Sequence, residues 1–166
     1  MLSLQRWFGG SKRMRSVSVY LRAKTYHVDT LHGSEGGEPC IAAGPVTSLS
    51  SDQPAEALGA AIREGLKLST HNYPFPKNQD DWKRVQHSLL AATKTKSWAA
   101  MAKRSSNVRI DQLGDTLQVL PSVRTAKGSF ERETGRDRTL QSPSDAELGR
   151  LVMDELVFAL ARDGAA

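Results

Sequence analysis

LGAAIREGL at residues 58–66 returns as LGRLVMDEL at residues 148–156, ninety positions later in the chain. Each copy follows Ser, Asp and Pro residues, in segments 50–54 and 142–145. Such residues suit a helix start, because a side-chain oxygen can accept from free backbone N–H groups and Pro fits the first turn. Strand-like, β-branched sequence precedes both copies. The repeat therefore predicts a strands-then-helix unit that is used twice in one compact domain.

The first half predicts three strands and a helix. Residues 16–31 alternate apolar and polar side chains, which indicates a hairpin with one solvated face. Residues 40–49 are expected to form a third, more buried strand, broken at Gly44-Pro45. The amphipathic pattern predicts a helix over residues 54–69.

The second half predicts further strands from Val108, Leu117 and Phe130 onward, and a closing helix over residues 144–161. Between the halves, residues 79–90 predict a helix whose acidic first turn suits the helix dipole. This helix is expected to place Trp82 inward, with Val85, Leu89 and Leu90. A short helix through residues 98–102 follows. The expected fold class is α+β: a single domain with a mostly antiparallel sheet, packed helices and two degenerate strands-then-helix halves.

The two Leu-Gly pairs make a specific structural prediction. Gly59 and Gly149 occupy equivalent mid-helix positions, where Gly costs about 1 kcal/mol relative to Ala. Their use at both positions predicts a close approach of each helix to the sheet.

Length and composition predict one soluble domain. The chain has 166 residues, of which 39% are hydrophobic and 25% charged, and it has no apolar run long enough to span a bilayer. Its N-terminus lacks the apolar core of a secretory signal. Cys40 has no partner cysteine and is expected to be a small buried thiol. We expect a cytoplasmic protein with a flexible basic tail over residues 1–15 and a single domain over residues 16–166.

No pattern of residues indicates catalysis or a cofactor. The four histidines lack metal-ligand spacing, and Gly33, Gly36 and Gly37 lie among acidic residues that would repel phosphate. Glu131 and Glu133 are expected to belong to a solvated, salt-bridged sheet edge. The sequence therefore predicts a protein that is not an enzyme, with no catalytic residues, no cofactor and no metal.

The net charge of +5 is unevenly distributed. Residues 1–15 contribute +4, whereas residues 33–81 contribute −4. Residues 82–104 contain six cations and no acid, which leaves open an alternative function as a nucleic-acid-binding module. Helical spacing would spread these cations around two short helices, as on an ordinary solvated face.

The order of several short motifs resembles a known family. These motifs are Ser50-Ser51-Asp52 with the helix from Glu56, Asp81-Trp82, Lys96-Ser97-Trp98, and Ser142-Pro143-Ser144 with Glu147-Leu148-Gly149. Together they are similar to the immunity proteins of bacterial contact-dependent growth inhibition systems, over about Ser16 to Leu160. The resemblance implies an immunity-type domain that forms a one-to-one complex with the toxic C-terminal domain of its cognate effector. Such toxins are commonly nucleases, and the family has no catalytic residues to transfer.

Partner-binding residues are expected in the acidic stretch. Charge complementarity speeds association, and interface energy concentrates in aromatic anchors. The candidates are Glu35, Glu38, Asp80 and Asp81, with Tyr73, Phe75 and Trp82 as anchors. The alternative is that Trp82 belongs to the core and the acids are ordinary surface residues.

Overall fold

The computed structural model describes residues 13–35 and 37–164. Its first half has the predicted order of three strands and a helix. These elements are β1 (Arg15–Arg22), β2 (Thr25–His32), β3 (Ile41–Ser50) and α1 (Ala55–Leu68). Residues 1–12 of the predicted tail lie outside the described residues, and Arg15 already begins β1.

The second half repeats this order along the chain. β4 begins at Ser105 and α4 at Asp145, each 90 residues after the start of its counterpart, β1 or α1. The elements are β4 (Ser105–Leu113), β5 (Thr116–Arg124), β6 (Phe130–Arg132), the 3-10 turn η2 (Thr134–Arg136), β7 (Arg138–Gln141) and α4 (Asp145–Arg162). The prediction of two strands-then-helix halves is confirmed.

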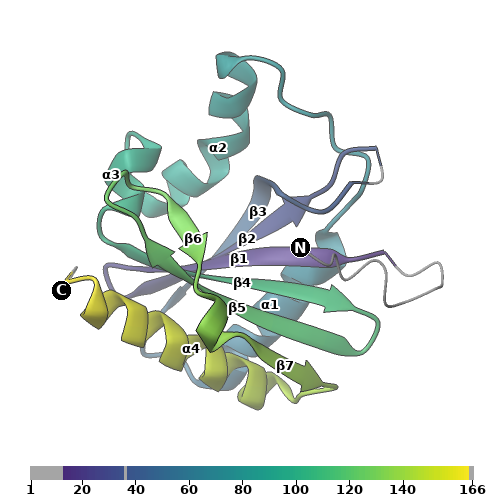
Figure 1. The fold of residues 1–166 in the computed structure, drawn as a ribbon, viewed down its shortest axis with the longest axis vertical. Helices are drawn as coiled ribbons and strands as arrows, with labels where there is room; N and C mark the ends of the chain where they lie inside the picture. The colour runs from purple at the N-terminus through teal and green to yellow at the C-terminus, as the bar shows by residue number, and fades with distance from the viewer. Residues whose placement is uncertain (1–12, 36, 165–166) are drawn as a thin grey trace.

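A seven-stranded sheet joins the halves, with strand order β3-β2-β1-β4-β5-β6 and with β7 also paired to β5 (Figure 1). All the strand pairs are antiparallel. At the centre, Val19 of β1 lies opposite Val108 of β4, and Ser18 lies opposite Arg109. The 90-residue offset carries Ser18 onto Val108 and Val19 onto Arg109. The two halves are therefore related by a pseudo-two-fold axis through this point of the sheet.

The main core lies between the sheet and the pair α1 and α4. Its largest contributors are apolar residues of the central strands and the inner faces of both helices: Val17, Val19, Val108, Ile110, Leu58, Ile62, Leu66, Leu148, Val152 and Leu156. All of them are almost completely buried. The period-two and period-3.6 patterns of the sequence therefore meet on one face of the sheet.

Gly59 and Gly149 lie where α1 and α4 cross. A Cβ atom on Gly59 would stand 1.9 Å from the carbonyl oxygen of Asp145, and one on Gly149 would stand 1.7 Å from that of Ala55. The predicted close approach exists, but its predicted partner is wrong, because each helix approaches the other helix there rather than the sheet. Equivalent residues of two related helices meet at the axis between them.

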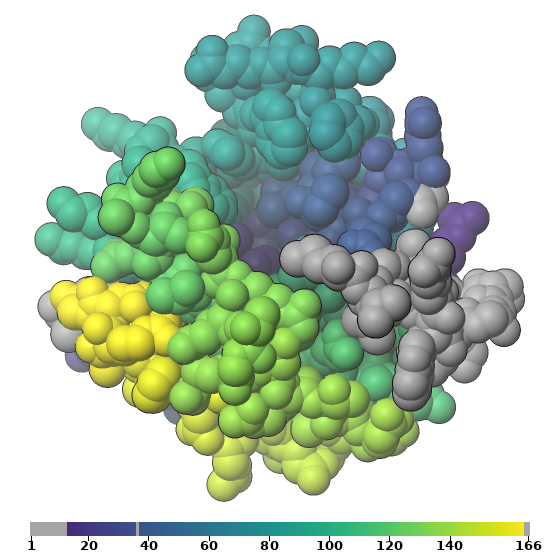
Figure 2. All heavy atoms as spheres, in the orientation of Figure 1, coloured from purple at the N-terminus to yellow at the C-terminus, as the bar shows by residue number. Residues whose placement is uncertain are grey.

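Two further helices, α2 (Gln79–Thr93) and α3 (Trp98–Ala102), lie between the halves in sequence. They cover the opposite face of the sheet, where Tyr20, Leu89 and Met101 form a second buried cluster. In Figure 2, α2 projects from the rest of the molecule at the top of the view. Val85 and Leu89 are buried as predicted, but Trp82 is 40% exposed. The inward placement of Trp82 is wrong, because the first turn of α2 extends past the sheet.

Two predictions for the third strand are also wrong. Most of the side chains of β3 are exposed or half-buried and not buried as predicted, although its pairing with β2 does shift register at Gly44-Pro45, between the pairs Asp29–Val46 and Leu31–Ala42. Cys40, just before β3, is exposed. Among the described strands, β3 pairs only with β2 at the edge of the sheet, so it gains less cover than a central strand.

Candidate partner-binding surface

The segment that connects α1 to α2 is fastened to the end of β2. The Ser69 hydroxyl donates to the Leu31 carbonyl at 2.6 Å. The Gly33 amide donates to the Thr70 carbonyl at 2.8 Å, and the Tyr73 amide donates to the Gly33 carbonyl at 3.0 Å. These bonds hold a chain with few local preferences of its own, because prolines at 74 and 76 exclude regular helix.

His32 strengthens this attachment. Its Nε2 donates to the Gly44 carbonyl at 2.6 Å, and its Nδ1 accepts from the Thr70 amide at 3.2 Å. The ring stacks on Tyr73, with 5.3 Å between the ring centroids and an interplanar angle of 24°. The first predicted anchor, Tyr73, is thus half-buried and held in place.

The other two predicted anchors are brought together at the start of α2. Phe75 and Trp82 meet edge to face, 6.1 Å apart, and they are 54% and 40% exposed. We call Tyr73, Phe75 and Trp82 the aromatic patch. Phe75 and Trp82 leave adjacent apolar area open to solvent, and contiguous exposed apolar area is a feature of binding surfaces.

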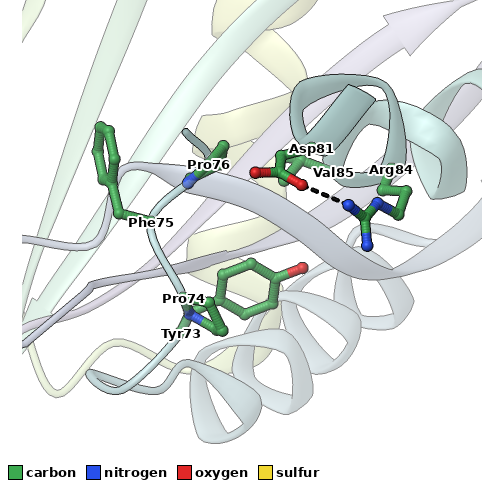
Figure 3. Close-up of a pocket in the computed structure, with 7 residues that line it drawn as sticks. All are labelled: Tyr73, Pro74, Phe75, Pro76, Asp81, Arg84 and Val85. Carbon is green, nitrogen blue, oxygen red and sulfur yellow. Dashed lines mark hydrogen bonds and ion pairs between the residues drawn. The ribbon is translucent and has the colours of Figure 1, made fainter. Parts of the chain in front are cut away.

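A shallow pocket of about 400 Å³ lies within this region, lined by residues 73–76, Asp81, Arg84 and Val85. Figure 3 shows the proline-containing segment crossing near the start of α2, with the Tyr73 and Phe75 side chains pointing in different directions. Pro76, which also lines the pocket, is buried. Rigid aromatic side chains on a fixed backbone lose little conformational entropy on binding.

Asp80 and Asp81 have local partners. The Asn78 side chain caps α2 by accepting from the Asp81 amide at 2.9 Å, and the Asp81 carboxylate accepts from the Lys77 amide at 3.0 Å. Asp81 also pairs with Arg84 (Figure 3), and Asp80 with Lys83 at 3.5 Å. These carboxylates therefore lie in the first turn of the helix, and each faces a basic side chain one turn further on.

Glu35 and Glu38 lie on the turn between β2 and β3, and both are exposed. The Gly33 end of this turn is hydrogen-bonded to residues 70 and 73. The structure thus joins their turn to the start of the segment that carries the aromatic patch. Neither glutamate forms an ion pair with a described residue.

The basic run of residues 82–104 is divided by the fold. Lys83 and Arg84 pair with carboxylates of α2, whereas Lys103 and Arg104 lie beyond the end of α3 and line a different cavity. Strands β1 and β5 bring other cations to that cavity, which sequence spacing did not reveal. The predicted spread around two helices is wrong, because only Lys83 and Arg84 lie within a helix and the other four cations follow the ends of α2 and α3.

The second edge of the sheet carries ion pairs, as expected for Glu133. Glu133 pairs with Arg162 of α4 at 2.5 Å, and Arg132 pairs with Asp137. Arg136 forms two bonds to the buried Glu155, at 2.8 and 3.1 Å. These contacts tie β6 and η2 to α4.

One buried carboxylate on the opposite sheet face lacks such support. Asp29 of β2 is fully buried, and neither of its oxygens has a hydrogen-bond partner among the described residues. Burial raises the pKa of Asp29 to about 7, although the nearby Gly44 backbone N–H lowers it somewhat without the geometry of a good hydrogen bond. The ionised Asp29 carboxylate therefore lowers the free energy of unfolding at neutral pH and above.

Within residues 13–35 and 37–164, no group of three or more His, Cys, Asp or Glu side chains is placed to hold a metal ion. None of the helices in these residues is long and apolar enough to cross a membrane.

The model of one protein family, described as CDI immunity protein, matches residues 15–158. The chain belongs to the CDI immunity protein family. The match covers both halves of the sheet, the insertion between them and most of α4. No curated protein sequence matches the chain significantly.

Solved structures share the fold of this family member. A protein of unknown function from Neisseria meningitidis has a TM-score of 0.72 at 16% identity, over 92% of this chain and 99% of that one. A chain from the CdiA-CT/CdiI toxin and immunity complex of Yersinia pseudotuberculosis has a TM-score of 0.68 at 15% identity, with the same coverage. At such identities the likeness is one of fold.

Proposed function

We propose that this protein neutralises one cognate CDI toxin, a nuclease, in the cytoplasm by forming a one-to-one complex without chemistry of its own. The family match over residues 15–158 carries the proposal. The proposal is supported by the similar fold of a chain from a toxin and immunity complex.

We further propose that the toxin docks on the aromatic patch. The patch combines exposed apolar area with a fixed backbone, and Trp and Tyr are the residue types enriched among interface hot spots. Asp80 and Asp81 would contribute little free charge to this surface, because Lys83 and Arg84 pair with them. Glu35 and Glu38 remain available as acidic contacts at its edge.

The test is co-expression with the toxin domain encoded beside the gene, followed by co-purification and measurement of cell survival. An inhibitor present near the toxin's concentration is expected to bind with a Kd near the nanomolar range, which corresponds to a binding free energy of about −12 kcal/mol. Failure of the wild-type chain to form a complex or to rescue cells would overturn the immunity function.

Two double variants test the docking surface. Replacing Phe75 and Trp82 with Ala should weaken toxin binding by about 2–4 kcal/mol or more, because hot-spot aromatics cost this much when truncated. Replacing Val157 and Phe158 with Ala is the control. These residues of α4 are 54% and 44% exposed, so the control removes comparable exposed apolar area elsewhere and should leave toxin binding unchanged. Equal losses in both variants would refute the assigned surface but leave the function standing.

A further inference from the structure

A second cavity, of about 730 Å³, lies away from the aromatic patch. It forms where the β1–β2 turn, β5 and the ends of α3 and α4 converge, at the left of Figure 1. Five cations line it: Arg22, Lys24, Lys103, Arg104 and Arg124. Its other lining residues carry no charged side chain.

None of these five cations forms an ion pair with a described carboxylate. The nearby Asp163 carboxylate is directed to Arg162, at 3.2 Å. By contrast, eight other Lys and Arg residues do form ion pairs with carboxylates in the described part of the chain, and they include Lys83 and Arg84 from the same basic run. Positive charge is therefore concentrated in the cavity without a counter-charge from the described residues around it.

Two of the guanidinium groups are held in position by backbone carbonyls. Arg22 Nη1 donates to the Met101 carbonyl at 3.0 Å. Arg124 donates to the Ala102 carbonyl at 3.4 Å and to the Asp163 carbonyl at 3.2 Å. Burial, and secondarily the charge of Arg104, lower the pKa of Arg22. Like charges are thus gathered and partly oriented before any ligand arrives, as in sites that focus an anion.

We propose that this cavity binds a compact polyanion with two or more adjacent phosphate groups, either a free polyphosphate or a stretch of RNA backbone. Guanidinium forks match phosphate oxygens in two-point contacts, and ammonium groups add point charges. The lining contains no aromatic residue, so it has no aromatic platform for stacking bases. The groups that it does present are cations, which match the phosphates. It does not depend on the aromatic patch or on the toxin.

The test is calorimetric titration of the full chain with tripolyphosphate, with a single-stranded RNA oligonucleotide and with a hexaglutamate peptide. Lys103 and Arg104 are exposed, so the double variant Lys103→Gln, Arg104→Gln should fold normally, which circular dichroism would check. The matched control is Lys83→Gln, Arg84→Gln, which removes the same charge from the same basic run outside the cavity. Tripolyphosphate should lose about tenfold or more in affinity in the cavity variant and less than about twofold in the control.

The three ligands distinguish the sources of the anion. Binding of tripolyphosphate with weaker binding of RNA indicates a free polyphosphate, and tighter, steeply salt-dependent binding of RNA indicates its backbone. Tighter binding of hexaglutamate than of either phosphate ligand would overturn the proposal in favour of an acidic protein segment. No binding of tripolyphosphate or RNA, or equal losses in both variants, would also overturn it.

Discussion

The two halves of the sheet share one plan and differ at their outer edges. In the first half, β3 is a single strand of ten residues. The equivalent segment of the second half is split into β6, η2 and β7. One residue pair at the 90-residue offset shows a further difference: Gly65 lets α1 approach Val17 of the sheet, whereas its counterpart Glu155 is buried and pairs with Arg136 of η2.

The insertion between the halves has no counterpart among the described residues. Helices α2 and α3 follow the first half only, and α2 with the segment before it carries the aromatic patch. The repeated elements supply the main core, whereas the insertion supplies part of the second buried cluster and the aromatic patch. The duplicated part of this fold is thus a scaffold on which the insertion is anchored through Leu89 and Met101.

The largest effect is expected at the crossing of the two repeated helices. Gly149→Leu, or equally Gly59→Leu, would place a side chain within 2 Å of a backbone carbonyl, which cannot move without separating α1 from α4. We expect a loss of more than about 4 kcal/mol in the free energy of unfolding, or failure to fold, since ordinary overpacking costs about 1–3 kcal/mol. Urea unfolding measures it.

The matched control is Gly135→Ala in the irregular edge of the second half. A Cβ atom there meets nothing within 4 Å, so stability should stay within about 0.5 kcal/mol. If either Leu variant retained the stability of the wild type, the two helices would not be closely packed at these glycines.

The next largest effect concerns two carboxylates on either side of β1. Folding raises the pKa of Asp29 from 3.8 to about 7, so the folded state binds this proton more tightly and the contribution to stability falls as pH rises between these values. Asp29→Asn should stabilise the protein by about 2–4 kcal/mol at pH 8. Near pH 4 it should have little effect. Unfolding measured across this range reports the difference.

Asp111 on β4 provides the contrast. It accepts from the Ser16 hydroxyl at 2.6 Å and from Arg109 at 2.7 Å, so Asp111→Asn should destabilise the protein by about 1–3 kcal/mol. Destabilisation by Asp29→Asn at pH 8 would show that Asp29 has a partner when folded, and the contrast would disappear.

The smallest effect is expected at the N-caps of the two repeated helices, which differ. Ser144 caps α4 in a reciprocal pair with Glu147, at 3.1 and 2.7 Å, whereas Pro54 at the start of α1 makes no side-chain cap. Ser144→Ala should cost about 1 kcal/mol and lower the melting temperature by a few degrees. Gln53→Ala, beside the uncapped start, should change neither. Equal stability of both variants would mean that the cap contributes nothing.

Much of the fold was predictable because its signals are local. The helices at residues 55–68 and 145–162 follow from amphipathic spacing and from polar starts, and the central strands follow from alternation. The predictions that failed concern neighbours in space. Cys40 and β3 look buried by composition but lie at an edge, and Trp82 has helical spacing but extends past the sheet.

The sequence by itself determined the doubled plan and the order of the elements, because repeats and periodicity can be read along the chain. Only the tertiary structure decided that Gly59 and Gly149 face another helix, and that Arg22 and Arg124 join Lys103 and Arg104. The physical reason is that such contacts link residues up to about a hundred positions apart. Strand pairing and helix crossing bring them together, and neither is encoded in the spacing of any one segment.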